Sequence, residues 1–247
     1  MKEERVIESS EISPTGLPKW KIGTYEYTFH GAFLQILFER FYKAEYLVLD
    51  GGCGEGQFLE KLREDVCVVG MDIERENIKE AKKRYKGHLF VVGDLQHLPF
   101  KIQAFHLIFC RDVLEHITKR GKAISEMTFA LRKKGVILIS TTNLLNPAML
   151  LDTLLPTKVS AKIIKKFKGP EYYERTSRFS PWEITKKLRE NGLDVKIIMF
   201  GFPSIGKPWH ARIDPPMIYR LWTVFDKITN FNLFRKFKEV IVAIARK

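Results

Sequence analysis

The residues of this chain that could do chemistry gather around Asp50, which is followed at alternate positions by Gly52, Gly54 and Gly56. Glycine adopts positive φ readily and has no Cβ, so a loop of this kind lets the backbone approach a ligand closely. A carboxylate beside the loop would repel phosphate and attract a cation or an ammonium group. The spacing therefore indicates a site for a nucleotide-like ligand that carries positive charge.

The elements around the glycines are typical of an open α/β sheet. An apolar run, Tyr46–Leu49, precedes Asp50, and helix-forming residues, Gln57–Arg63, follow the loop. In such sheets ligands bind beyond the carboxyl ends of the strands. The dinucleotide fingerprint G-x-G-x-x-G is not matched, because its third glycine would fall on Gln57, and no G-x-x-x-x-G-K-[ST] phosphate loop occurs. Both kinds of phosphate site are therefore disfavoured.

A second acid follows at the end of the next apolar run. Val66–Asp72 reads as a buried strand and places Asp72 about 20 residues past the glycine loop, the distance at which a carboxylate meets a ribose diol. Asp72 is therefore the ribose candidate, with Ile73 beside the adenine. Glu74 takes the ribose role if the strand ends later.

These residues resemble motif I of the class I S-adenosylmethionine-dependent methyltransferases, D-x-G-x-G-x-G, which Asp50, Gly52, Gly54 and Gly56 match at every fixed position. The resemblance covers Tyr46–Asn143 and looks closest to the quinone-pathway O-methyltransferases of the small-molecule branch. It implies S-adenosyl-L-methionine as cofactor and S-adenosyl-L-homocysteine as product. It also implies a Rossmann-like, seven-stranded, mostly parallel sheet with helices on both faces and the last strand antiparallel.

The resemblance implies further cofactor contacts. Asp94 matches the position that accepts from the adenine amino group, and Leu95 would lie against the ring. Cys53 lies inside the glycine loop, where a small side chain fits. Cys110 and Arg111, at the end of the fourth strand, complete the set of expected cofactor contacts.

On the acceptor side, His116 is the candidate base, one turn past the fourth strand, because histidine is the usual base near neutral pH. The alternative is that it only caps or packs. Glu115 is expected on another face of the same helix. Tyr25 and Tyr27 are substrate-side candidates, or else pack against the first helix. No group of ligands has metal-site spacing, so no metal is predicted.

Apolar runs and helical spacing predict the remaining elements. Helices are expected at Phe29–Lys43, Glu74–Lys86, Lys158–Lys168 and Ser180–Asn191, and strands at His88–Val92, Ala104–Cys110, Leu131–Asn143 (a Lys/Gly turn plus a strand), Leu193–Phe200 and Val240–Ala245. Ser180 is the expected N-cap of its helix, with Pro181 in the first turn and Gly192 closing it.

The 247 residues fit a single α/β domain. We expect an N-terminal segment and helix (1–45), a cofactor-binding core (46–146), a basic helical cap inserted after the fifth strand (147–180) and a C-terminal half of the sheet with a basic aromatic helix (181–247). The three cysteines form no C-x-x-C pair, and neither a signal peptide nor a membrane-spanning run is visible. A cytoplasmic protein is expected, and the oligomeric state stays open.

The excess positive charge lies late in the chain. Residues 147–247 hold 20 Lys and Arg against 9 Asp and Glu, whereas residues 1–146 hold 22 against 20. We expect this basic, aromatic C-terminal region to be a solvated surface, a lid or membrane-surface contact for a hydrophobic or anionic acceptor, or an RNA footprint. The place of the [DN]-P-P-[YF] motif of base N-methyltransferases is taken here by Arg111–Leu114, which disfavours that class.

The function predicted from the sequence is methyl transfer to a small, hydrophobic or anionic acceptor, with an oxygen favoured as the methylated atom. An RNA methyltransferase is the enzymatic alternative. A regulatory protein that binds S-adenosylmethionine without turnover is the second alternative.

Overall fold

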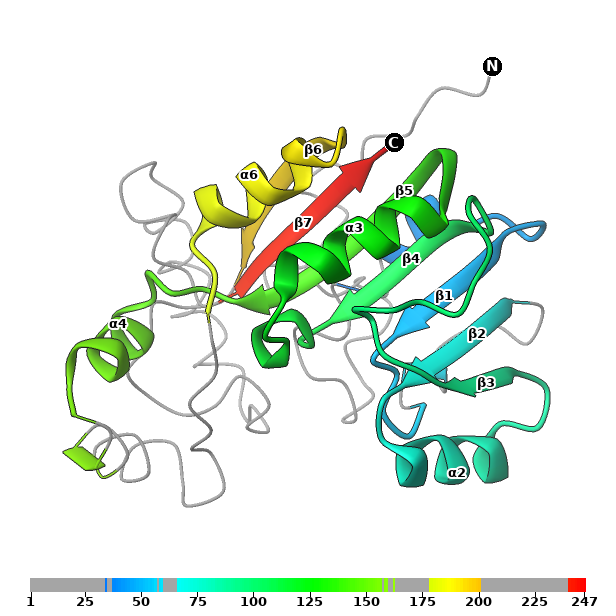
Figure 1. Ribbon diagram of the computed structural model, residues 1–247, viewed down its shortest axis with the longest axis horizontal. Coiled ribbons are helices and arrows are strands. Elements are labelled where there is room, and N and C mark those ends of the chain that lie inside the picture. The colour runs from blue at the N-terminus through cyan, green and yellow to red at the C-terminus, as the bar shows by residue number, and fades with distance from the viewer. Residues whose placement is uncertain are drawn as a thin grey trace, which may run out of the picture.

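The computed structural model of this chain describes residues 34, 37–56, 58–59, 66–156, 158–159, 162, 178–200 and 240–247. These ranges form a seven-stranded sheet in the order β3-β2-β1-β4-β5-β7-β6 (Figure 1). The strands are β1 (Leu47–Gly51), β2 (Cys67–Asp72), β3 (Leu89–Val92), β4 (Phe105–Arg111), β5 (Leu131–Thr142), β6 (Asp194–Phe200) and β7 (Val240–Arg246).

The strand directions confirm the predicted mixed sheet. The pairs from β3 across to β5 are parallel, and β7 runs antiparallel to both of its neighbours, β5 and β6. The strand order reverses between β1 and β4, because β1 is followed by β2 on one side and β4 by β5 on the other. At such a reversal the loops after the two strands separate, so their carboxyl ends border the ligand crevice.

Helices cover both faces of the sheet. The helices that lie within the described residues are α2 (Arg75–Arg84), the 3-10 turn η3 (Leu114–His116), α3 (Arg120–Ala130), α4 (Pro147–Leu154) and α6 (Pro181–Glu190). Side chains alternate along β4, so that Leu107 and Phe109 pack in one core cluster with α2, whereas Ile108 and Cys110 pack in the other with α3 and α6. Figure 1 shows α3 and α6 lying along the same face of the sheet.

The expected start and end of α6 are confirmed. The Ser180 hydroxyl accepts a hydrogen bond from the backbone N–H of Glu183 at 3.2 Å, Pro181 occupies the first turn, and Gly192 follows the helix at φ +78°. Arg120 of α3 bridges to this turn through an ion pair with Glu183 at 3.4 Å. The N-terminus of α6 is thereby fixed against α3.

The predicted Lys/Gly turn before the fifth strand is an irregularity inside β5. Pairing with β4 shifts from Phe105 opposite Leu131 to Leu107 opposite Val136, and Lys134, between the two pairs, has φ +63°. The backbone N–H of Lys134 bonds the carbonyl of Lys247 at 2.9 Å. The strand therefore begins earlier than a turn-plus-strand interpretation allows, because its first residue still pairs with β4.

Several predicted elements fall wholly or partly outside the described residues. Of the helix expected at Phe29–Lys43, Leu34, Leu37 and Phe38 are described and buried in the core cluster that contains α2. Most of Gln57–Arg63, most of Lys158–Lys168 and all of residues 201–239 lie outside. Within the described part of the chain, none of the helices combines the length and the apolarity that crossing a bilayer demands.

Candidate functional site

The glycine loop leaves β1 at its carboxyl end and turns back over β2. Gly52, Gly54 and Gly56 all have positive φ (78°, 55° and 83°), a backbone conformation that residues other than glycine adopt only at a cost in free energy. The N–H groups of Gly52 and Cys53 both donate to the carbonyl of Met71 in β2, at 2.7 and 3.0 Å. The three glycines are thus required by the path of the loop itself.

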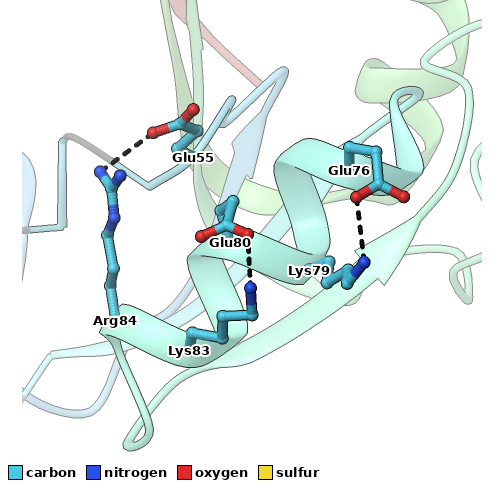
Figure 2. A network of polar contacts seen from close by, with 6 residues as sticks. All are labelled: Glu55, Glu76, Lys79, Glu80, Lys83 and Arg84. Atoms are coloured by element: carbon cyan, nitrogen blue, oxygen red, sulfur yellow. Dashed lines mark hydrogen bonds and ion pairs between the residues drawn. The ribbon is translucent and has the colours of Figure 1, made fainter.

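The end of α2 supports the far side of the loop. A Cβ built on Gly56 would lie 2.9 Å from the ring of Tyr85, so the loop packs directly on this residue at the end of the helix. Figure 2 shows Arg84 reaching from α2 to Glu55 of the loop, an ion pair of 3.0 Å. Both partners of the ion pair are well exposed, so packing rather than charge provides most of this support.

Asp50 is a buried carboxylate beside the loop. Its side chain is 3% exposed, and Oδ2 has no hydrogen-bond partner. Burial raises the pKa of Asp50 from 3.8 to about 6; Arg111 lowers it in part, and Asp72 adds to the rise. A buried acceptor without a donor is costly to a fold, and a cationic ligand at this position would supply the missing partner.

Asp72, at the end of β2, orders the glycine loop after β1 and the backbone that follows β2. Its Oδ2 accepts from the N–H of Gly54 at 2.8 Å, and its Oδ1 accepts from the N–H of Glu74 at 2.9 Å and from Asn77 at 3.2 Å. Ile73, beside it, is an apolar side chain that is 63% exposed. An exposed apolar side chain next to a carboxylate suits a nucleoside.

Asp94 and Leu95 follow β3 at the same edge of the sheet. Asp94 accepts from the backbone N–H of Gln96 at 2.8 Å and from its side-chain amide. Leu95 is buried, and its Cδ2 would lie 2.8 Å from a Cβ on Gly51. Leu95 therefore packs beneath the start of the glycine loop, and its expected contact with adenine stays a prediction.

The two cysteines of the site are packing residues in this structure. Cys53 and Cys110 are buried, and burial, followed by the nearby carboxylates, raises the pKa of both thiols. Cys53 Sγ lies 3.1 Å from the position that a Cβ on Gly70 would take, so a side chain at position 70 would crowd Cys53. Arg111 ends β4 with its guanidinium 5.7 Å from the centre of the Phe58 ring.

The segment after β4 places Glu115 and His116 in opposite environments. Glu115 is 5% exposed and turned toward β5, whereas His116 is exposed. The prediction that these neighbours lie on different faces is confirmed. Asp112 precedes them with φ +53° and is partly buried.

The two carboxyl groups of this segment both titrate above their usual range. Burial raises the pKa of Asp112, and the hydrogen bond from the Ser140 hydroxyl offsets part of this rise. Burial, followed by the Asp112 carboxylate, raises the pKa of Glu115. His116 is close enough to lower the pKa of both acids. Asp112 was not singled out from the sequence, and the buried role of Glu115 was missed; the only signal was an acid placed among apolar residues in Val113–Leu114–Glu115.

His106, another histidine of the described residues, has a structural role. His106 accepts from the N–H of Leu47 at 3.0 Å and stacks on Tyr46, with ring centres 4.6 Å apart, so it secures the start of β1. Tyr25 and Tyr27 lie outside the described residues. Among the residues that are described, no group of three or more His, Cys, Asp or Glu could hold a metal ion.

Part of this chain is similar in sequence to known proteins. Residues 49–139 match the family described as "Methyltransferase domain". An uncharacterised protein of Methanocaldococcus jannaschii is 35% identical over 101 residues, which are 41% of this chain and 43% of that protein. The malonyl-[acyl-carrier protein] O-methyltransferase of Hamiltonella defensa is 33% identical over 95 residues, 38% of this chain and 37% of the relative. The chain thus spans less than half the length of these relatives.

Structural similarity to known proteins covers more of this chain than sequence similarity does. The crystal structure of an S-adenosylmethionine-dependent methyltransferase from Mesorhizobium loti superposes with a TM-score of 0.59 over 88% of this chain and 98% of that chain. The two sequences are only 14% identical, so this likeness concerns the arrangement of the elements alone.

Proposed function

We propose that this chain, which has the core of a class I S-adenosylmethionine-dependent methyltransferase, transfers a methyl group from that cofactor to an oxygen of an acceptor molecule. One observation carries the proposal: the buried Asp50 carboxylate, with Oδ2 unpartnered, beside a loop of three positive-φ glycines. A phosphate ligand would meet a like charge there, whereas a sulfonium nucleoside with a free ammonium group would supply the missing donor.

The residues present fit the cofactor. Asp50 and the glycine loop would hold its charged end, and the carboxylate of Asp72 would accept from the ribose hydroxyls. Ile73 offers the exposed apolar surface for adenine, with Asp94 and Leu95 at the adenine edge. Cys53 and Cys110 are buried in the packing around the strand ends, and Arg111 ends β4 beside them. When bound there, S-adenosylmethionine would supply the methyl group.

The acceptor side is assigned to the segment after β4. His116 is exposed next to the carboxylate of Asp112, which would stabilise an imidazolium formed when the ring takes the acceptor proton. An oxygen acceptor is favoured because the curated relatives include proteins named malonyl-[acyl-carrier protein] O-methyltransferases. We propose that residues 147–180 and 201–239 select the acceptor by its size and charge.

The proposal is tested by binding first and transfer second. Calorimetry should show S-adenosylhomocysteine binding to the purified chain, with no comparable binding of NAD or ATP. Labelled S-adenosylmethionine incubated with fractionated cell extract should then label one small-molecule fraction. Binding without transfer to any fraction would favour the regulatory alternative, and uptake of NAD or ATP instead would sink the proposal.

A second acceptor class follows from the charge of the chain. Residues 147–247 carry 20 basic against 9 acidic residues, the kind of excess that RNA attracts. Label that appears in RNA, with binding that weakens steeply as salt rises, would identify this alternative.

A further inference from the structure

Two carboxylates attach the segment after β4 to the carboxyl end of β5. Asp112 Oδ1 accepts from the hydroxyl of Ser140 at 2.9 Å, and its backbone N–H donates to the carbonyl of Ser140 at 3.0 Å. Glu115 Oε2 accepts from the hydroxyl of Thr141 at 2.9 Å. Its Oε1 accepts from the hydroxyl and the backbone N–H of Thr142, at 3.2 and 3.4 Å. We call these five residues the β5 clamp.

The clamp encloses the residue that touches the glycine loop. Val113 stands between Asp112 and Glu115, and a Cβ on Gly52 would lie 2.3 Å from Val113 Cγ2. The turn η3 that follows is closed by a hydrogen bond from the N–H of His116 to the carbonyl of Val113 at 2.9 Å. The segment is thus held between β5 on one side and the loop on the other.

Packing alone does not explain Glu115. Its carboxyl group is buried, and a leucine of similar size would fill the space without losing hydration. The side chain instead receives hydrogen bonds from three donors on two consecutive residues, which fix its position in a way that an apolar contact does not. These hydrogen bonds fix the orientation of residues 112–116 and their register against β5.

We propose that Asp112 and Glu115 are positioning residues of the cofactor site, which set the affinity for the cofactor by holding Val113 against Gly52. The inference rests on the proposed function, because it concerns the same site. Neither carboxylate needs to touch the ligand. Loss of a clamp hydrogen bond would let the segment move away from the loop, so that Gly52 loses the support of Val113.

Substitutions at Thr141 separate hydrogen bonding from packing. Thr141→Val keeps the shape and removes the hydroxyl, so binding of S-adenosylhomocysteine should weaken about tenfold, the scale of a hydrogen bond to a charged group. Thr141→Ser keeps the hydroxyl and should retain affinity close to that of the wild type. Glu115→Gln should weaken binding at least as much as Thr141→Val. The matched control is Glu126→Gln, because Glu126 also accepts a backbone N–H, from Leu98 at 3.1 Å, but outside the clamp.

The double variant Glu115→Gln/Thr141→Val tests whether both changes break one contact. Its affinity loss should be clearly smaller than the two single losses combined. Hydrogen exchange should also speed up at residues 113–117 in both single variants, with or without ligand. Equal affinity of wild type and Thr141→Val, or a loss in Thr141→Ser as large as in Thr141→Val, overturns the positioning role.

The two proposals fail in different ways. Absence of S-adenosylhomocysteine binding by the wild type contradicts the proposed function, and with it the claim that the β5 clamp sets the affinity for this ligand. Normal binding by the wild type and by both clamp variants contradicts only the positioning role.

Discussion

The side chain of Val113 occupies the space that a Cβ on Gly52 would need, with its Cγ2 and Cγ1 only 2.3 and 2.9 Å from that position. Gly52 also has φ +78°, so two separate constraints apply to one residue. One is conformational and belongs to the backbone, and the other is steric and belongs to a neighbour. Mutagenesis can distinguish them.

Gly52→Ala should destabilise the protein by about 2–4 kcal/mol, since positive φ and overpacking each cost on the order of 1–2 kcal/mol. Adding Val113→Ala removes the steric part only, so the double variant should be less destabilised than the two single variants combined. Urea unfolding followed by circular dichroism measures both. Gly87→Ala is the control, because no heavy atom lies within 4 Å of its Cβ position. Simple additivity would mean that Val113 does not press on the loop.

Asp50→Asn should make the free protein more stable above pH 6, and at the same time weaken cofactor binding. The pKa of Asp50 is raised from 3.8 to about 6, which corresponds to about 2–3 kcal/mol. Near pH 4 the group is protonated in the folded protein and only about half ionised in the unfolded chain, so wild type and variant should differ little. As pH rises from about 4 to about 6, the unfolded chain releases the Asp50 proton while the folded protein still holds it, so the wild type loses stability over this range and the loss is complete above pH 6.

Chemical unfolding at pH 4 and pH 8 measures this difference. Glu80→Gln is the control, because Glu80 lies on the surface of α2, where loss of its contact with Lys83 should change stability little at either pH. A stability gain for Asp50→Asn that is equal at both pH values would show that ionisation of Asp50 is not its cause.

Asp72→Asn should weaken S-adenosylhomocysteine binding by about 1–3 kcal/mol, the scale of buried hydrogen bonds. The change replaces one carboxylate oxygen by a donor, and it also disturbs the contact with the N–H of Gly54 at 2.8 Å. Asn77→Ala is the matched variant, since it removes one partner of Asp72 and leaves the carboxylate. Calorimetry compares the two, and unchanged affinity in Asp72→Asn would mean that the ribose assignment is wrong.

His116→Ala should reduce methyl transfer about 10²–10⁴-fold if the imidazole takes the acceptor proton. The side chain is exposed, so stability and S-adenosylhomocysteine affinity should stay near those of the wild type. Transfer into the labelled extract fraction provides the measurement. A variant that transfers at the normal rate leaves His116 with a structural role.

The sheet was largely predictable because its strands are apolar runs, the first three of which end at or just before an acid or a glycine. Asp50, Asp72 and Asp94 could be placed at the carboxyl edge from their positions after such runs alone, and the structure brings them to that edge. The helix cap at Ser180 was predictable for a similar reason, since its signal is local.

Glu115 could not be read from local signals in the same way. Its partners, Thr141 and Thr142, lie 26 and 27 positions further along the chain, so the burial of its carboxylate depends on how β5 pairs with β4. The irregularity near Lys134 was recognised as a turn, but its place inside a strand depends equally on that pairing. Contacts between distant segments decide both features.

The position of β7 has a consequence for how the protein is made. Residues 240–246 fill the gap between β5 and β6, so on the ribosome both of those strands emerge well before the strand that joins them. Until then, Ile137 and Ile139 belong to an unfinished sheet edge, which is prone to aggregate. We expect this half of the sheet to assemble last, and a nascent chain halted before residue 240 to need a chaperone.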